Sequence, residues 1–116
     1  MKKENDNGKN TINSMTYLNS TIDRPFQMMV LHLILKGNRS FNKLLEEVGG
    51  ENKRSELSGT IGLFKLHGLI SVVPVEGVKG VKHFYESSEL AHEFETYIKL
   101  KAELGRKLLE HRKNNL

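Results

Sequence analysis

The chain has 116 residues, 37% of them hydrophobic, and a formal net charge of +4 at pH 7. This length fits one small domain with a modest core, near the size at which a second subunit often supplies part of the burial. With no cysteine, the sequence has neither a disulfide framework nor a thiolate metal site. No stretch of about 18 apolar residues is present to span a membrane, and no signal-peptide core follows the basic N-terminus, so we expect a cytoplasmic protein. The mild positive charge permits a nucleic-acid partner without requiring one.

The N-terminal segment MKKENDNGKN is polar, rich in asparagine and unperiodic. It predicts a disordered arm over residues 1–10, followed by one domain over 11–116. A short amphipathic helix with Thr11 as its N-cap is expected next, because apolar residues recur every three or four positions at Ile12, Met15, Leu18 and Ile22.

The segment FQMMVLHLIL is apolar around nearly its whole helical circumference, which is typical of a buried central helix. Asp23 is expected to cap this helix, Pro25 suits its first turn, and Gly37 should end it after Lys36. Its two methionines are expected to fill gaps in the core, and His32 to be structural. The apolar face is formed by Phe26, Met29, Val30, Leu33 and Ile34, broadened by Met28, Leu31 and Leu35.

The segment FNKLLEEVGG predicts the next helix, after a short extended link. Gly49 and Gly50 should end it, since glycine tolerates the left-handed backbone that is common after a last helical turn. Its inward side chains are Phe41, Leu44, Leu45 and Val48.

The stretch NKRSELSGTIGLFKLHGLI predicts a third helix, capped by Asn52 and ended by Gly68, with Leu69 folded back on its last turn. A buried stripe at i, i+4 and i+7 is formed by Leu57, Ile61 and Phe64. Alanine would stabilise this helix by about 1 kcal/mol more than glycine at each of Gly59 and Gly62. A face kept small and positive favours the close approach of an anionic partner. The side expected to point away from the core carries Lys53, Arg54, Ser55, Ser58, Gly59, Thr60 and Gly62.

A β-hairpin is predicted after this helix. LISVVPV is β-branched, EGVKG is a glycine-flanked turn with Lys79 near its tip, and VKHFY alternates as a second strand. Pro74 lacks a backbone N–H, which indicates that the first strand lies at an edge.

The last predicted element is a long helix over about 88–113, capped by Ser87 or Ser88. It would be roughly 39 Å long at about 1.5 Å per residue, longer than a domain of this size covers by itself. Its apolar stripe consists of Leu90, Phe94, Tyr97, Ile98, Leu104 and Leu108, widened by Leu100 and Leu109. We therefore predict a homodimer in which the same helix of a second subunit covers the stripe. Two alternatives are that the stripe folds back on its own domain and that Gly105 kinks or ends the helix early.

The order of these elements resembles the winged helix-turn-helix DNA-binding proteins, in particular the small dimeric regulators of the MarR, PadR, ArsR and HxlR kind. LFKLHGLI resembles the family's recognition-helix ending, and HFYESSELAHEF resembles its wing strand leading into the last helix. The resemblance covers residues 23 to about 113. It implies a mostly α fold with a small antiparallel β-hairpin and a long C-terminal dimerisation helix.

The resemblance further implies that residues 40–48 act as a supporting helix, that 53–67 enter the major groove, and that the 76–82 wing contacts the backbone of double-stranded DNA. Short outward side chains suit a groove about 12 Å wide, and hydroxyls can bond to phosphates or base edges. We therefore expect a sequence-specific DNA-binding protein acting as a dimeric transcriptional regulator, such as a repressor. The candidate contacts are Arg39, Ser40, Lys53, Arg54, Ser55, Ser58, Gly59, Thr60, Gly62, Lys65, Lys79 and Lys82.

Other functions have weaker support in the sequence. It contains no nucleophile–base constellation, no P-loop and no GxGxxG, so we expect no enzyme activity and no cofactor. Glu89, His92, Glu95 and His111 supply too few adjacent ligands for a metal site, and we expect none. Two readings stay open beside the regulator: a centromere-binding adaptor for plasmid or phage DNA partition, and a helical interaction module that does not bind DNA.

Overall fold

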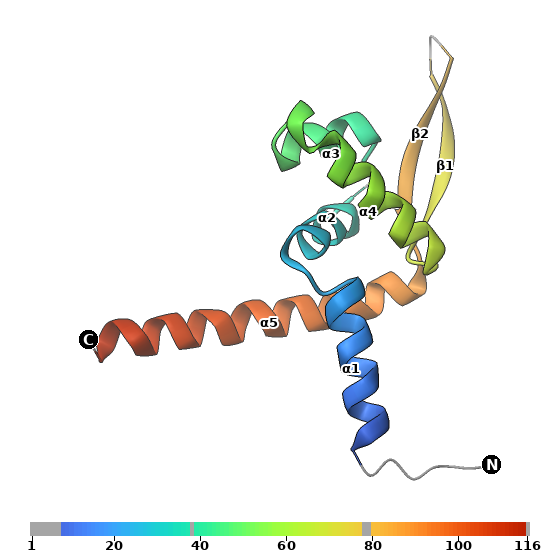
Figure 1. Ribbon diagram of the computed structural model, residues 1–116. Helices are drawn as coiled ribbons and strands as arrows, with labels where there is room; N and C mark the ends of the chain where they lie inside the picture. The colour runs from blue at the N-terminus through green and yellow to red at the C-terminus, as the bar shows by residue number, and fades with distance from the viewer. Residues whose placement is uncertain (1–7, 38, 78–79, 116) are drawn as a thin grey trace, which may run out of the picture.

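The computed structural model describes residues 8–37, 39–77 and 80–115, without the side chains of residues 75–82. The chain is mostly α-helical with one antiparallel hairpin, as the sequence predicts (Figure 1). Its elements are α1 (Lys9–Thr21), α2 (Pro25–Leu35), α3 (Phe41–Val48), a 3₁₀ turn (Glu51–Lys53), α4 (Arg54–Leu66), β1 (Ile70–Gly77), β2 (Gly80–Ser87) and α5 (Glu89–Asn114). Among the helices of these ranges, none is both long and apolar enough to cross a membrane.

The core lies where α2, α3 and α4 meet the base of the hairpin. The largest side chains below 2% exposure that fill it are Val30, Leu31, Leu44, Leu57, Phe64 and Leu69. These come from the expected apolar faces, so the periodicity of the sequence identified the inward sides correctly. The expected burial of α2 all round is wrong, because Met29 is 40% exposed and His32 lies at the surface.

The first two helices begin differently from the expectation. Helix α1 starts at Lys9, after Gly8 with φ +93°, so Thr11 is not its cap. Residues 1–7, which make up most of the expected disordered arm, lie outside the described residues. Helix α2 starts at Pro25 as expected, but Arg24 occupies its cap position without a side-chain bond. Asp23 instead accepts hydrogen bonds from Tyr97 Oη and Lys101 Nζ of α5, a partnership between segments far apart in the chain.

Helices α3 and α4 are separated by the glycine turn. Gly49 and Gly50 have φ values of +129° and +94°, which confirms why glycines end α3. Asn52 is not the cap of α4, because it lies inside the 3₁₀ turn that precedes that helix. After α4, Gly68 adopts φ +70°, and the N–H of Leu69 donates to Phe64 O at 2.9 Å. This confirms the predicted left-handed ending, which returns the chain to the core.

The hairpin pairs Val72 with Tyr85 and Pro74 with His83. Tyr85 N–H also donates to Arg39 O at 3.0 Å, so β2 has a second neighbour in the link between α2 and α3. In the described part of the chain β1 pairs only with β2, which confirms Pro74 on an edge strand.

Helix α5 starts at the Ser88 cap, whose Oγ accepts from Ala91 N–H and donates to Gly68 O at 2.7 Å. It continues through Gly105, so the predicted long helix is confirmed and the alternative that Gly105 ends it early is wrong. Its first half packs on the domain, with Ala91 fully buried, whereas its second half extends away from it (Figure 1). Leu104 and Leu108 are 50% and 73% exposed, so the far end does not fold back on its own domain. The radius of gyration is 17.5 Å, against about 13 Å for a compact chain of this length.

Candidate nucleic-acid interface

Helix α4 has one buried and one open side. Leu57, Ile61 and Phe64 are at most 4% exposed and fasten it to the core. The opposite side carries a row spaced i, i+4, i+7 and i+11, which we call the outward row: Ser55, Gly59, Gly62 and Leu66. All four residues are exposed, so the face is small and polar except at its last position.

Gly59 and Gly62 have no reason inside the domain to be glycine. Neither has a positive φ, and a Cβ added at either position would meet no heavy atom within 4 Å. Glycine inside a helix costs about 1 kcal/mol relative to alanine. The two residues therefore reduce helix stability at positions where the fold itself would accept a side chain.

Thr60 was expected on the outward side, and this expectation is wrong. It is 2% exposed, and its hydroxyl donates to Glu56 O at 2.9 Å. On the helix surface Thr60 lies next to the stripe of Leu57 and Phe64, and it is buried with them. It has no free polar atom to offer a partner.

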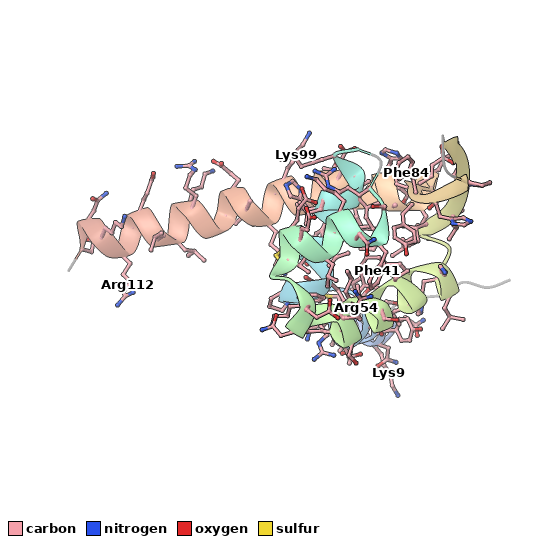
Figure 2. The ribbon with its side chains drawn as sticks, turned by 90° about the horizontal axis from the view of Figure 1, so that it is seen from above. Lys9, Phe41, Arg54, Phe84, Lys99 and Arg112 are labelled. Atoms are coloured by element: carbon pink, nitrogen blue, oxygen red, sulfur yellow. The ribbon has the colours of Figure 1, made fainter. Side chains whose placement is uncertain are left out.

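The cations at the start of α4 are engaged with neighbouring acids. Arg54 Nε lies 2.5 Å from Glu51 Oε2, and its guanidinium lies 5.5 Å from the centroid of the Phe41 ring. Figure 2 shows Arg54 beside Phe41. The hydrogen bond to Glu51 raises the pKa of Arg54, and the same bond lowers the pKa of Glu51. Both side chains are at least half exposed, so the pair is weak and can exchange for another anion.

Lys53, the last residue of the 3₁₀ turn, and Lys65 in α4 differ in their contacts. Lys53 Nζ lies 3.6 Å from Glu56 Oε1 and 5.9 Å from the Phe26 ring centroid. Lys65 is exposed and makes no ion pair with any described residue. Lys65 is thus the cation of this helix that needs no rearrangement to meet a phosphate.

Arg39 and Ser40 organise the start of α3. Arg39 Nε and Nη2 donate to the two carboxylate oxygens of Glu47 at 2.7 and 3.3 Å, and Nη1 donates to Gly37 O at 3.2 Å. The hydrogen bond from Arg39 lowers the pKa of Glu47. Ser40 Oγ accepts from Lys43 N–H as the cap of α3. Both residues therefore build the supporting helix, and a contact with a partner would compete with these bonds.

The predicted wing residues lie largely beyond what the structure describes. Lys79 is outside the described residues, and so is the side chain of Lys82. Strand β2, which carries Lys82, lies beside α3 and α4 together with β1, and its Gly80 end is the end far from α5 (Figure 1).

Sequence reasoning missed two residues at the end of α4. His67 Nδ1 lies 3.0 Å from Leu63 O, and Nε2 lies 2.7 Å from Tyr17 Oη on α1. With Nδ1–H donating to Leu63 O, Nε2 accepts a hydrogen bond from the Tyr17 hydroxyl, and the imidazole ring links α1 to the end of α4. Leu66 is 78% exposed, a position that helical spacing predicts once the buried side is known.

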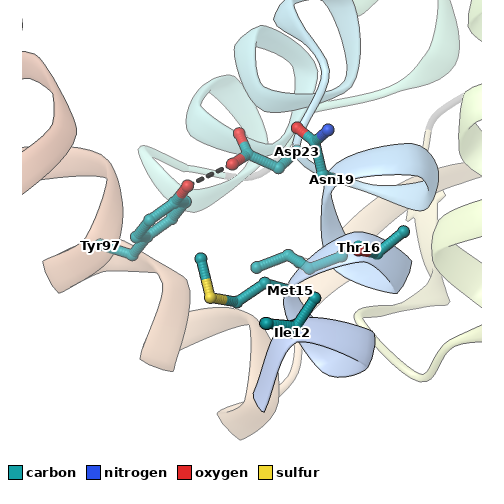
Figure 3. Close-up of a pocket in the computed structure, with 7 residues that line it drawn as sticks. Ile12, Met15, Thr16, Asn19, Asp23 and Tyr97 are labelled. Carbon is teal, nitrogen blue, oxygen red and sulfur yellow. Dashed lines mark hydrogen bonds between the residues drawn. The ribbon is translucent and has the colours of Figure 1, made fainter. Parts of the chain in front are cut away.

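A second candidate surface lies between α1 and α5. A cavity of about 400 Å³ there is lined by α1 residues including Ile12 and Met15, and by Asp23 and Tyr97 (Figure 3). A neighbouring cavity shares Leu18 and Tyr97 with it. Ile12 and Met15 are each 63% exposed, so this groove is apolar and open. The α5 residues that line the two cavities, including Phe94 and Tyr97, lie in the first half of that helix.

No family model matches the sequence, and no curated protein matches it. The fold does match solved structures. A protein assigned to the MarR family of transcriptional regulators, from Enterococcus faecalis V583, aligns with a TM-score of 0.78 at 12% identity, covering 96% of this chain and 99% of that one. The reduced form of the transcriptional regulator YodB from B. subtilis aligns at 0.64 and 13% identity, covering 77% and 86%.

A third match is a homodimeric winged helix-turn-helix DNA-binding domain from Mycobacterium bovis, described as that of a possible ArsR-family regulator. It aligns at 0.63 and 16% identity, covering 96% of this chain and 95% of that one. These similarities show that the chain has the winged helix-turn-helix fold, in agreement with the resemblance in its sequence.

Proposed function

We propose that this winged helix-turn-helix chain is a dimeric, sequence-specific double-stranded DNA-binding protein that acts as a transcriptional regulator, such as a repressor. Helix α4 enters the major groove, α3 supports it, and the 76–82 wing reaches the adjacent backbone. The similar structures are described as transcriptional regulators or a DNA-binding domain, which supports this class of function.

The observation that carries the proposal is the pair of glycines on the outward row. Gly59 and Gly62 are helical, exposed and open to solvent, so they reduce stability without helping the domain to pack. A backbone without side chains at two successive turns allows another surface to approach closely. A DNA groove about 12 Å wide is such a surface, because a helix enters it only where its side chains are short.

The polar groups around the glycines suit the edges and walls of that groove. Ser55 and Ser58 are exposed hydroxyls that can bond to a base edge or a phosphate. Lys65 meets the phosphate backbone directly, and Arg54 does so by exchanging Glu51. Lys79 and Lys82 of the wing contact the adjacent phosphate backbone in this proposal.

The exposed second half of α5 is the reason for proposing a second subunit. Leu100, Leu104, Leu108 and Leu109 are at least 50% exposed there. An apolar stripe of this kind on a helix that leaves its own domain needs a cover in water. A second copy related by a two-fold axis supplies it. Such a dimer would present two α4 helices about 34 Å apart, one helical turn of DNA.

The test measures how tightly the Gly59→Glu variant binds duplex DNA. The duplex is first recovered from random sequences by selection with the wild-type protein. A glutamate at this position brings both bulk and negative charge to the groove, so we expect binding to fall at least 100-fold while the helical circular dichroism stays unchanged. Thr96→Glu is the matched control, because it adds the same charge on an exposed part of α5 outside the apolar stripe. If Gly59→Glu binds the duplex like the control, α4 does not enter a groove.

A further inference from the structure

Leu66 is an apolar side chain in an unexpected place. At 78% exposure it is the most exposed large hydrophobic residue in the described part of the chain. The next buried apolar residue, Leu69, returns to the core after the turn at Gly68. Leu66 itself takes no part in that core, so the stability of the domain gives no reason for a leucine here.

Its position relates it to the proposed DNA-binding face. Leu66 stands four residues after Gly62 on the outward row, whose other members are serine or glycine. Along the helix axis it is about 10 Å from Gly59, at about 1.5 Å per residue, which corresponds to about three base steps. If the glycines allow the helix into the groove, the last turn brings Leu66 to the base edges beyond them.

The chemistry of the groove limits what a leucine can recognise there. Guanine is usually read by arginine or lysine and adenine by asparagine or glutamine, and the outward row contains none of these. Thymine alone presents a methyl group in the major groove, and apolar side chains contact it. A leucine without hydrogen-bonding groups favours a thymine over the polar edges of the other bases.

We propose that Leu66 is a specificity-determining residue that contacts the 5-methyl group of a thymine in each half-site. The inference rests on the proposed entry of α4 into the major groove and adds the identity of one base pair to it. Ser55 at the start of the row supplies a hydroxyl contact, the two glycines allow the close approach, and Leu66 supplies the apolar contact.

The experiment replaces thymine by uracil, which pairs identically but lacks the methyl group. The probe is the duplex recovered by selection with the wild-type protein, prepared with thymine or with uracil at one position at a time. We expect one position per half-site at which uracil weakens wild-type binding about three- to fivefold, the value of one buried methyl group. Leu66→Ala should bind the thymine and uracil duplexes equally at that position.

Val72→Ala is the control, because Val72 is another exposed apolar side chain, 38% exposed, on β1. It should keep the wild-type loss on uracil replacement. Two results overturn the proposal. In the first, the wild-type protein binds every uracil duplex as tightly as the thymine duplex. In the second, uracil replacement weakens the binding of Leu66→Ala as much as it weakens that of the wild type. If the wild-type protein selects no duplex at all, the proposed function itself fails, and the assignment of Leu66 fails with it.

Discussion

At the scale of single residues, Gly59 and Gly62 are positions where the residue best for helix stability differs from the residue that the proposed function needs. Both lie in a regular helix with open space around their Cα atoms, so the domain gains nothing from their lack of a side chain. The proposed entry of α4 into a DNA groove would explain the serine, the glycines and the leucine of the outward row together.

The first prediction is that Gly59→Ala and Gly62→Ala change stability and DNA binding in opposite directions. Each should raise the free energy of unfolding by about 1 kcal/mol, because alanine is the better helix former. Each should also weaken duplex binding about tenfold, because the added methyl group holds the helix away from the base edges. Urea unfolding and fluorescence anisotropy on the same samples measure the two effects. Variants that gain stability with unchanged affinity would show that the glycines serve no close contact.

Residues whose burial or partners depend on the packed fold were the hardest to predict. Thr60 lies on the flank of a helical stripe, where spacing alone does not decide between core and surface. Asp23 precedes a proline-initiated helix and has the local signature of a cap, yet Tyr97 and Lys101 of α5 bind its carboxylate. The wrong assignment followed from a contact that no local pattern contains.

At the scale of elements, Asp23 links the start of α2 to the middle of α5. Its side chain is only 11% exposed. Burial alone would raise the pKa of this carboxyl, but the hydrogen bonds from Lys101 and Tyr97 outweigh it and hold the pKa below the usual value of 3.8. The hydrogen bond to Asp23 in turn raises the pKa of Tyr97 and that of Lys101.

The second prediction concerns stability in acid. A carboxyl whose pKa is lower in the folded state stabilises the protein above its unfolded pKa, and this contribution is lost as pH falls through the folded pKa. Asp23→Asn should therefore reduce the free energy of unfolding by about 1–2 kcal/mol at pH 7, as hydrogen bonds to charged groups do. The difference from the wild type should shrink below about pH 4. Unfolding curves of both proteins from pH 2.5 to 7 give the comparison, and a difference independent of pH would show that the charge of Asp23 does not matter.

The elements themselves were largely predictable from the sequence. Apolar spacing identified the helices, and Gly49, Gly50 and Gly68 marked two helix ends, because positive φ angles at those positions restrict the residue type. The start of α1 and the 3₁₀ turn before α4 were not predicted. Both follow a glycine with positive φ, Gly8 and Gly50, and a glycine in the sequence does not by itself reveal which φ it adopts.

At the scale of the whole molecule, α5 explains why the chain is extended. Its 26 residues span about 39 Å, and only the first part packs on the domain. The protruding part bears leucines, whereas a helix meant to stand alone in water would carry polar residues all round.

The third prediction is that Leu104→Glu and Leu108→Glu each convert a dimer to a monomer. Burying a glutamate between two α5 helices would cost several kcal/mol, because its charge would have no partner. Sedimentation at micromolar concentration should show the wild-type protein at twice 13.2 kDa and both variants at 13.2 kDa. Thr96→Glu, on another side of the same helix, should remain a dimer. A wild-type monomer of 13.2 kDa that binds a single half-site would rule out the dimer.

The fold of the whole molecule was recognised from patterns and not from residue identity. Three similar structures share only 12% to 16% of their residues with this chain. Element order, the helix ending in LFKLHGLI and the long last helix carried the resemblance, and these are patterns of spacing and turn residues that do not require overall sequence identity. The individual contacts of the proposed interface were less predictable, because they depend on the shape and chemistry of the partner as well as on the fold.

The central claim is that α4 and its neighbours bind double-stranded DNA through its phosphates and grooves. The most direct test is the affinity for the selected duplex at several salt concentrations between about 50 and 200 mM, since each phosphate contact adds about 0.9 to the slope of log K against log salt. We predict an affinity that falls at least tenfold over this range, with a slope reduced by about 1 in Lys65→Ala. A protein that binds the duplex no better at about 50 mM than at about 200 mM salt would contradict the claim.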